Sequence, residues 1–275
     1  MKISILLFLF FVIVAPGLSF AITDLDSAIR LPNVTFEEAE KDYLLRLKNE
    51  RPDAYLEQDS SAHGSAVPYD KLDFSKVPKW EDDDVEKVFA KIRDERFLAE
   101  DTRPDFKRRI SWLYPHDGCF ARAAMAGQKL DTWKVIRPAK LFIFGSLNVK
   151  TPNAVAGSVS WWYHVVPLVV DEDGEYLVLD PAINPKKPML VKDWVLTMIS
   201  DVKNVKLSVC NAFSYVPSSS CLEANAKTEE PSATSQKYYL SQEWQNLVSL
   251  KRSPEKELGD FPPWLSGDLL ISFLQ

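Results

Sequence analysis

Apolar residues recur at helical spacing in the first third of the chain. This spacing predicts a helix over residues 36–49, opened by a capping box of Thr35 and Glu38, and a second helix over residues 82–99. The stretch between them, residues 52–78, is rich in Pro, Ser, Asp and Gly, which predicts a linker or loop. The first third is therefore expected to be mainly helical.

In the middle of the chain the apolar residues form near-continuous runs, which are typical of buried strands. The expected strands are residues 140–147, 161–170, 175–179 and 205–210, the expected helices are 193–200 and 238–250, and residues 221–236 are expected to be a loop. A mixture of helices with strands joined by a short turn predicts the α+β class.

The N-terminus has the features of a secretory signal peptide. An apolar run from Ile3 to Val14 follows Lys2, and Ser19 and Ala21 occupy the small positions of a cleavage site. The run is too short to be a persuasive membrane span. We therefore expect residues 1–21 to be removed and the mature chain to be secreted or periplasmic, with no membrane attachment.

Charge divides the mature chain unevenly. Residues 22–103 carry 21 acidic and 13 basic side chains, whereas residues 104–275 carry 18 and 19. This difference predicts a separate acidic N-terminal segment (22–103) followed by a domain of nearly neutral charge (104–275). No basic or aromatic stripe indicates nucleic-acid binding, and three dispersed histidines indicate no metal site or other cofactor.

The chain contains three cysteines, Cys119, Cys210 and Cys221. In an oxidising compartment Cys210 and Cys221 can close a small loop, which chain-entropy estimates value at roughly 3 kcal/mol. Three different pairings are possible from sequence. The expected pairing leaves Cys119 as an unpaired thiol in an exported protein, which indicates a reactive residue.

Cys119 lies in the stretch YPHDGCFARAAMAGQK. A helix-forming run over residues 120–129 follows Asp117, which predicts Asp117 at the N-cap and the thiol in the first turn. There the helix dipole favours a thiolate, and hence a nucleophile. The alternative is a small buried residue at a helix start.

A nucleophilic cysteine needs a base. His63 lies in the linker-like stretch and is expected to be a solvated loop residue, and His116 lies just outside the N-cap, where a side chain rarely points along the helix. His164 lies inside the apolar run WWYHVVPLVV, where an imidazole without a partner would be costly. It is either a buried histidine satisfied by the backbone or a base held by the sheet.

The turn after this run separates those two interpretations. A three-residue loop of Glu172, Asp173 and Gly174 pairs residues whose numbers sum to 346, and it places Asp180 on the same face as His164. A two-residue turn would give a sum of 347 and send Asp180 to the other face. A triad of Cys119, His164 and Asp180 therefore predicts the three-residue loop.

Three blocks in this order, DGCFARA, SWWYHVVPLVV and YLVLDP, resemble the bacterial protein glutaminases, secreted enzymes that deamidate glutamine side chains within proteins. The order of Cys, His and Asp is also similar to the papain and transglutaminase core. The resemblance implies such a core, with a helix N-terminus packed on an antiparallel sheet. It implies that Cys119 is the nucleophile, His164 the base and Asp180 the orienting acid, and that the acidic segment is an inhibitory prosegment.

The expected activity is hydrolysis of glutamine side chains in proteins or peptides, with a thioester intermediate and release of ammonia. Candidate substrate contacts are Trp161, Trp162, Tyr163 and His116, and the protein is expected to be a monomer. A cysteine peptidase or a transglutaminase would use the same triad. An exported binding module without turnover is the non-enzymatic alternative.

Overall fold

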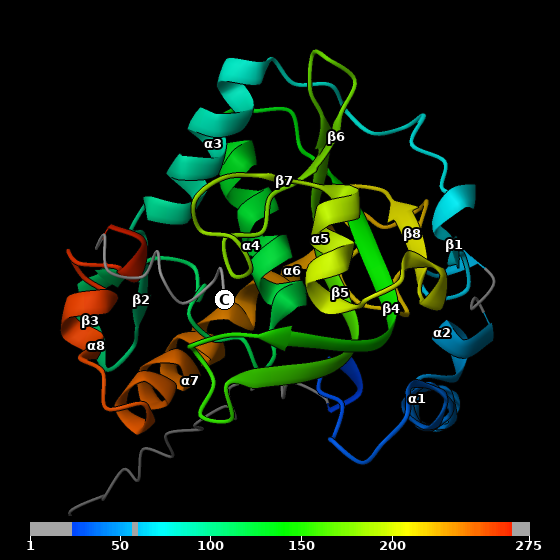
Figure 1. Ribbon diagram of the computed structural model, residues 1–275, viewed down its shortest axis with the longest axis horizontal. Helices are drawn as coiled ribbons and strands as arrows, with labels where there is room; N and C mark the ends of the chain where they lie inside the picture. Colours follow the sequence, from blue (N-terminus) through cyan, green and yellow to red (C-terminus); the bar gives the residue numbers. More distant parts are fainter. Residues whose placement is uncertain (1–23, 57–59, 266–275) are drawn as a thin grey trace, which may run out of the picture.

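The computed structural model describes residues 24–56 and 60–265, so the predicted signal peptide lies outside the described residues. Its centre is a six-stranded sheet with the order β1-β8-β4-β5-β6-β7, in which every neighbouring pair is antiparallel. Helices surround this sheet, the start of α4 packs against it, and the predicted α+β class is confirmed (Figure 1). Within the described ranges, no helix has the length and apolar character needed to cross a membrane.

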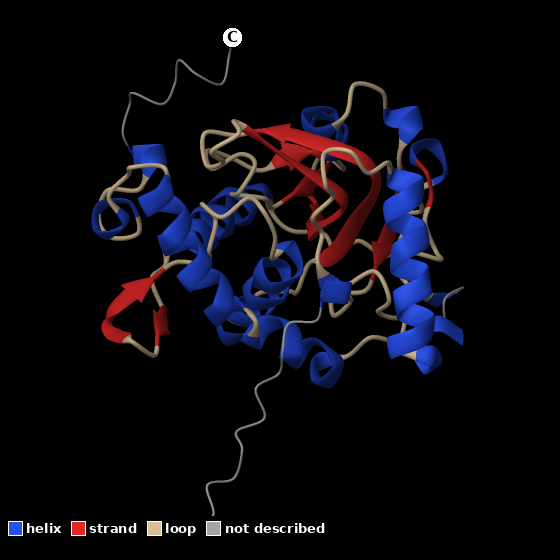
Figure 2. Cartoon of the chain, turned by 90° about the horizontal axis from the view of Figure 1, so that it is seen from below, coloured by secondary structure: helices blue, strands red, loops and turns tan. Residues whose placement is uncertain are grey.

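The helices and strands alternate irregularly along the chain. The helices are α1 (Phe36–Glu50), α2 (Pro52–Leu56), α3 (Asp82–Asp94), α4 (Cys119–Thr132), α5 (Val191–Met198), α6 (Ala226–Thr234), α7 (Gln236–Ser249) and α8 (Pro254–Glu257). The strands are β1 (Val67–Pro68), β2 (Leu98–Glu100), β3 (Arg103–Arg108), β4 (Ala139–Lys150), β5 (Ser158–Val170), β6 (Tyr176–Val178), β7 (Met189–Leu190) and β8 (Lys206–Cys210). The β2–β3 pair forms a separate small sheet, away from the main one (Figure 2).

The turn between β5 and β6 has the predicted register. Leu168 pairs with Val178 and Val170 with Tyr176, so partner numbers sum to 346. Gly174 ends the three-residue loop with φ of 85°, in the left-handed region that favours glycine. The hairpin prediction is confirmed, and with it the placement of Asp180 on the His164 side.

Two of the helices expected in the first third are present, although one is shorter than predicted. The helix α1 has the predicted capping box, in which Thr35 and Glu38 bond each other's backbone amides. The helix α3 ends at Asp94 rather than at residue 99, because the chain turns there into β2, which pairs with β3. Residues 98–99 are therefore strand, and that part of the prediction was wrong.

Two segments expected to be loops contain regular structure. The stretch 52–78 includes α2 and β1, and β1 forms one edge of the sheet through its pairing with β8. The stretch 221–236 includes α6, because Glu229, fully buried, forms ion pairs with Lys140 and Arg137 and so attaches the helix to the sheet. The hydrophobic pattern did not predict this helix, because the residue that attaches it to the sheet is charged rather than apolar.

The described residues form three hydrophobic clusters, two of which include residues of α4. The largest cluster joins the sheet to α1, α5 and the start of α4 and includes Cys119, Phe142 and Trp194. A second cluster joins α3 to α4 around Phe89 and Leu130. The helix α4, which carries Cys119, therefore packs on both clusters and is fixed along its whole length.

Candidate active site

Cys119 is the first residue of α4, as the sequence predicts, but the residue that caps the helix is Gly118 rather than Asp117. Gly118 has φ of 81°, a left-handed conformation. A Cβ at this position would lie 2.8 Å from the ring of Tyr239. Both the backbone angle and the close approach of Tyr239 require glycine here, so the N-cap assignment to Asp117 was wrong.

The Asp117 carboxylate is buried and accepts hydrogen bonds from two backbone amides, Gly118 at 2.7 Å and Ala28 at 3.0 Å. Burial raises the pKa of this carboxyl, although the two amide donors, the Ser27 side chain and Arg122 act in the opposite direction. Asp117 therefore connects the start of α4 to a segment 89 residues earlier in the chain.

The thiol of Cys119 is 2% exposed. Burial raises its pKa to about 12, although Arg122 and hydrogen bonds from the backbone amides of Val165 and Phe120 favour the thiolate. In this conformation desolvation is the largest influence on the thiol, and it opposes the thiolate that a position at the helix start favours. The sulfur nevertheless lies beside Val165, the residue that follows His164 on β5.

His164 and Asp180 form a buried pair. The Nε2 atom of His164 lies 2.9 Å from Oδ2 of Asp180, and the same oxygen accepts a hydrogen bond of 3.0 Å from the indole of Trp194. Burial raises the pKa of Asp180, but the charge and hydrogen bond of His164 and the bond from Trp194 outweigh it, so the net shift is downward. Asp180 is therefore held as a carboxylate.

The ring of His164 is stacked between two indoles. Its centroid is 4.7 Å from the ring of Trp161 and 5.7 Å from that of Trp194, with interplanar angles of 16° and 27°. Its Nδ1 atom is buried and has no hydrogen-bond partner among the described residues. Because Nε2 is committed to Asp180, Nδ1 is the nitrogen left for proton exchange with a neighbouring group.

The four candidate substrate contacts do not line an open groove. Trp161, Trp162 and Tyr163 are 3%, 4% and 0% exposed, and their polar atoms donate to backbone carbonyls. His116 is half-buried, with its ring 5.5 Å from that of Tyr114, and its carbonyl accepts a hydrogen bond from Trp161. A role for these residues in binding substrate stays a prediction.

Residues 24–30, which we call the N-terminal strap, cover this part of β5. Ile29 pairs with Trp161 in an antiparallel bridge, Trp162 donates its amide to Ala28, and Arg30 donates its amide to Ser160. The indole of Trp162 donates to Ser27, and the hydroxyl of Tyr163 donates to Asp26. The strap thus forms a short added strand on β5, through backbone hydrogen bonds.

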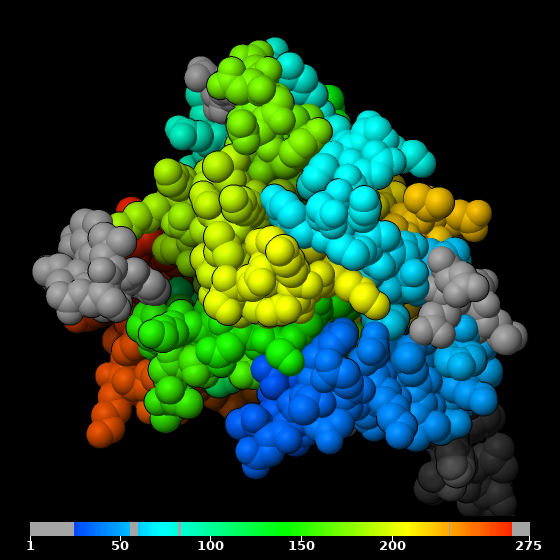
Figure 3. Space-filling view, turned by 45° about the vertical axis from the view of Figure 1, so that its right-hand side comes forward, coloured from blue at the N-terminus to red at the C-terminus, as the bar shows by residue number. Residues whose placement is uncertain are grey.

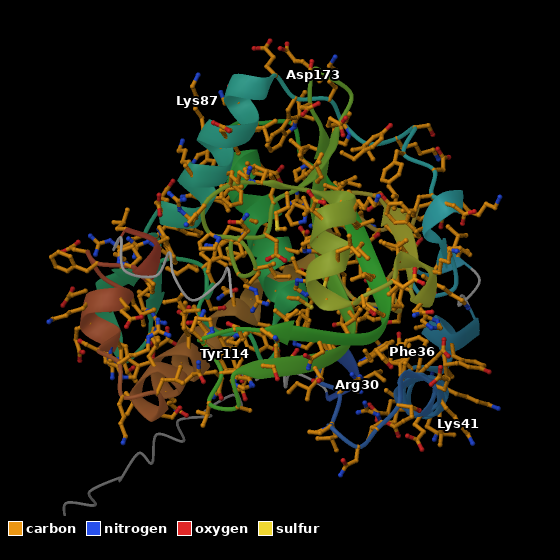
Figure 4. The ribbon with its side chains drawn as sticks, in the orientation of Figure 1. Arg30, Phe36, Lys41, Lys87, Tyr114 and Asp173 are labelled. Atoms are coloured by element: carbon orange, nitrogen blue, oxygen red, sulfur yellow. A yellow bond between two sulfur atoms is a disulfide. The ribbon has the colours of Figure 1, made fainter. Side chains whose placement is uncertain are left out.

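The space-filling view shows the blue N-terminal residues packed directly against the green central part of the chain (Figure 3). In the stick view Arg30 lies beside the green strands, with Phe36 and Lys41 farther along on α1 (Figure 4). The Arg30 guanidinium donates to the carbonyls of Trp161 and Leu147 and so attaches the end of the strap to β4 and β5.

Two further cysteines form the predicted disulfide, Cys210–Cys221, which is confirmed. Within the described part of the chain, no group of three or more His, Cys, Asp and Glu residues is arranged to hold a metal ion. No sequence pattern indicated the places of Trp194, Arg122 and the strap beside the candidate active site. Trp194 occurs in an amphipathic helix pattern, where an indole is ordinarily read as core, and nothing local distinguishes it.

His63 also differs from its expected role as a solvated loop residue. Its Nε2 atom lies 2.9 Å from Glu40, and its side chain is 10% exposed. The loop that carries it is anchored by amides of Ala62 and His63 that donate to the carbonyls of Ser219 and Pro217. A polar sequence is buried here because its backbone finds partners in the disulfide loop.

Two comparisons with known proteins gave matches, one to a family model and one to solved structures. Residues 85–198 match a family model described as glutaminase. The crystal structure of a pro-protein-glutaminase has a TM-score of 0.50 and 19% identity, covering 78% of this chain and 85% of that one. A protein-glutaminase crystal structure has a TM-score of 0.44 and 22% identity, covering 60% and 89%. A mutant pro-protein-glutaminase has a TM-score of 0.44 and 21% identity, covering 62% of each chain.

The comparison with curated proteins gave no match. The family match begins within α3 and ends with α5, so it contains Cys119, His164 and Asp180. The structural likeness to pro-protein-glutaminase extends over the larger part of both chains. The resemblance of this chain to the protein glutaminases is therefore confirmed, with residues 85–198 as the matched region.

Proposed function

We propose that this protein is an exported cysteine amidohydrolase that converts glutamine side chains of proteins or peptides to glutamate and releases ammonia. Cys119 is the nucleophile, His164 the general base and acid, and Asp180 the residue that orients the imidazole. The observation that carries the proposal is the His164–Asp180 pair, whose imidazole keeps Nδ1 without a partner among the described residues and lies on β5 next to Val165, whose amide bonds the Cys119 sulfur.

The reaction begins with transfer of the Cys119 proton to Nδ1 of His164, which Asp180 stabilises as a cation. The thiolate attacks the carboxamide carbon, and backbone amides at the start of α4 stabilise the oxyanion. The imidazolium gives its proton to the departing nitrogen, which leaves as ammonia, and a thioester remains. His164 then takes a proton from water as the water attacks the thioester, and glutamate and the thiol are released.

The strap supports a proposal of latency. Cys119 and His164 are 2% and 1% exposed, and the strap is bonded to β5, the strand that carries His164, and to Asp117, two residues before Cys119. A polypeptide substrate would have to displace the strap, and it could then pair with the same edge of β5 by backbone hydrogen bonds. We therefore propose that the N-terminal segment acts as an inhibitory prosegment, as expected for residues 22–103.

The matched family region includes most of α3, and α3 contributes Phe89 and Ile92 to the core. We therefore propose that the part that must leave the site is the strap, while α3 stays with the catalytic domain. Cleavage near residues 99–104, in the exposed turn between β2 and β3, is expected to raise activity if it also allows the strap to dissociate.

The decisive experiment measures ammonia released from casein by the wild type and by Cys119→Ala, before and after limited proteolysis. We expect release by the cleaved wild type, and none above background by the variant. Casein should stay intact and monomeric on a denaturing gel. Fragments would favour a cysteine peptidase, and crosslinks a transglutaminase. No ammonia and no labelling of Cys119 by iodoacetamide would favour a binding module.

The strap can be tested without a protease. Ala28→Pro removes the amide that donates to Asp117, and we expect iodoacetamide to label Cys119 at least about tenfold faster, because a buried carboxylate loses a donor. Ile29→Pro is the matched control, since the Ile29 amide donates to the Ser27 hydroxyl and not to β5 or Asp117. Equal labelling rates in Ala28→Pro and the wild type would contradict the latency proposal.

A further inference from the structure

Arg122 is a buried arginine one helical turn after Cys119. Arg122 is 3% exposed, and its Nη1 atom donates to the carbonyls of Tyr114 at 2.9 Å and Asp117 at 2.8 Å. These carbonyls belong to the loop that leads into α4. The guanidinium therefore holds this loop, and with it the start of α4 where Cys119 lies.

This cation has no close anionic partner. Among the described residues, no carboxylate lies within ion-pair distance of Arg122, whereas the buried Arg108 has two, Glu100 and Glu243. Holding a buried charge without such a partner is costly, and the carboxylates of Asp117 and Asp180 interact with Arg122 only from beyond ion-pair distance.

The ionisable groups around Arg122 and Cys119 come from every element packed there. From the helix start and the preceding loop they are Tyr114 and Asp117, from β5 they are Tyr163 and His164, after β6 there is Asp180, and from α7 they are Tyr239 and Glu243. Arg122 acts on Cys119, Asp117 and Asp180 in the same sense, favouring the negative form of each.

The opposing influences on Cys119 can be ordered. Burial raises the pKa of the thiol most, Arg122 is the strongest influence in the other direction, and the carboxylate of Asp117 raises the pKa further. The thiolate must form in this desolvated place for the proposed chemistry to begin. A fixed positive charge on the same helix is the arrangement that makes this possible.

We propose that Arg122 is a positioning residue with two tasks: it holds the Tyr114–Asp117 loop, and it supplies the permanent positive charge that balances the Cys119 thiolate during turnover. The role in turnover rests on the proposed amidohydrolase function, but the effect on the thiol does not. In this proposal His164 accepts and donates the proton, whereas Arg122 keeps its positive charge throughout the reaction.

The test is the pH dependence of iodoacetamide alkylation of Cys119 in the full-length chain, followed by mass spectrometry; the other two cysteines are joined in a disulfide. We expect the midpoint for Arg122→Gln to rise by about one pH unit or more, and alkylation below the midpoint to be about tenfold slower. Arg122→Lys keeps the charge, so its midpoint should stay within about half a pH unit of the wild type.

Arg109→Gln is the matched control. Arg109 is half-buried and likewise donates to two carbonyls, those of Leu258 and Gly259, but it is not among the groups that act on Cys119. Its midpoint should equal that of the wild type. If the effect came from a general loss of packing, the midpoint would shift in both Arg122→Gln and Arg109→Gln.

An unchanged midpoint in folded Arg122→Gln, or an equal rise in Arg122→Gln and Arg122→Lys, would overturn the proposal. If Arg122→Gln does not fold, Asp117→Asn replaces it: removing the opposing negative charge should lower the midpoint, and a midpoint that does not fall would overturn it. Ammonia release is measured separately, so a wild type without deamidase activity would refute the proposed function and leave the result on the thiol unaffected.

Discussion

Two histidines of this protein make the same bond in different surroundings. His164 and His63 each place Nε2 2.9 Å from a carboxylate, Asp180 or Glu40, and each has a buried Nδ1 without a partner among the described residues. By the pair alone they are indistinguishable. A histidine and a carboxylate at hydrogen-bond distance therefore do not by themselves identify an active site.

The surroundings separate the two pairs. The side chain of Asp180 is 3% exposed and is also held by Trp194, whereas that of Glu40 is 29% exposed. His164 lies between two stacked indoles and next to the residue that bonds the Cys119 sulfur. His63 has aromatic neighbours, including Phe144 with its centroid at 5.2 Å, but it lies in the N-terminal segment, outside the matched family region. Of these two pairs, the first alone lies beside Cys119, the proposed nucleophile.

The largest expected effect tests this contrast directly. In the cleaved enzyme, His164→Gln should lower the rate of ammonia release by about 10²- to 10⁴-fold, the usual contribution of a general acid–base residue. His63→Gln, which removes an equivalent bond, should change the rate by less than about threefold. A similar loss in both variants, measured with casein at equal protein concentration, would remove the distinction between the two histidines.

We expect the disulfide to stabilise the loop that carries His63 and to have little effect on the His164–Asp180 pair. Cys210–Cys221 closes the loop whose carbonyls accept the amides of Ala62 and His63. Replacing both cysteines by serine should lower the free energy of unfolding by roughly 3 kcal/mol, measured by urea denaturation. Hydrogen exchange should increase around residues 60–68, while the rate of ammonia release at 25 °C changes little. Faster exchange confined to β5 would contradict this.

The next prediction concerns Trp194, whose indole N–H donates to Asp180 in the His164–Asp180 pair. Trp194→Phe keeps the aromatic ring but removes the N–H that donates to Asp180, so we expect the turnover number to fall about tenfold, with a smaller change in KM. Trp162→Phe is the control, since its indole donates to Ser27 of the strap. That variant should label faster with iodoacetamide without a loss of turnover. Equal kinetics for Trp194→Phe and the wild type would exclude the positioning role.

The smallest expected effect concerns pH. Burial lowers the pKa of His63, against the opposing influence of Glu40, so the unfolded chain binds the proton more readily than the folded one. The free energy of unfolding is therefore expected to decrease as the pH falls below about 6.5, by at most about 1.4 kcal/mol per pH unit. His63→Gln should remove this part of the dependence. Asp180, with its lowered pKa, should contribute separately and only in stronger acid, below about pH 4.

The sequence by itself determined the features that depend on neighbours in the chain. The apolar runs fixed the central strands, and the loop of Glu172, Asp173 and Gly174 fixed the register that brings Asp180 to His164. The capping box and the disulfide follow equally short-range rules. These contacts span 16 residues or fewer, so periodicity and turn chemistry are enough to predict them.

The tertiary structure alone decided the surroundings of Cys119. Burial is the main influence that raises the pKa of Cys119, and the bond from Ala28 to the adjacent Asp117 joins residues 89 positions apart. No hydrophobic period encodes such a contact, because it is made by backbone amides that every residue except proline has. The same reason explains the missed helix α6 and the role of Arg122: buried charges and backbone groups find partners that are chosen in space and not along the chain.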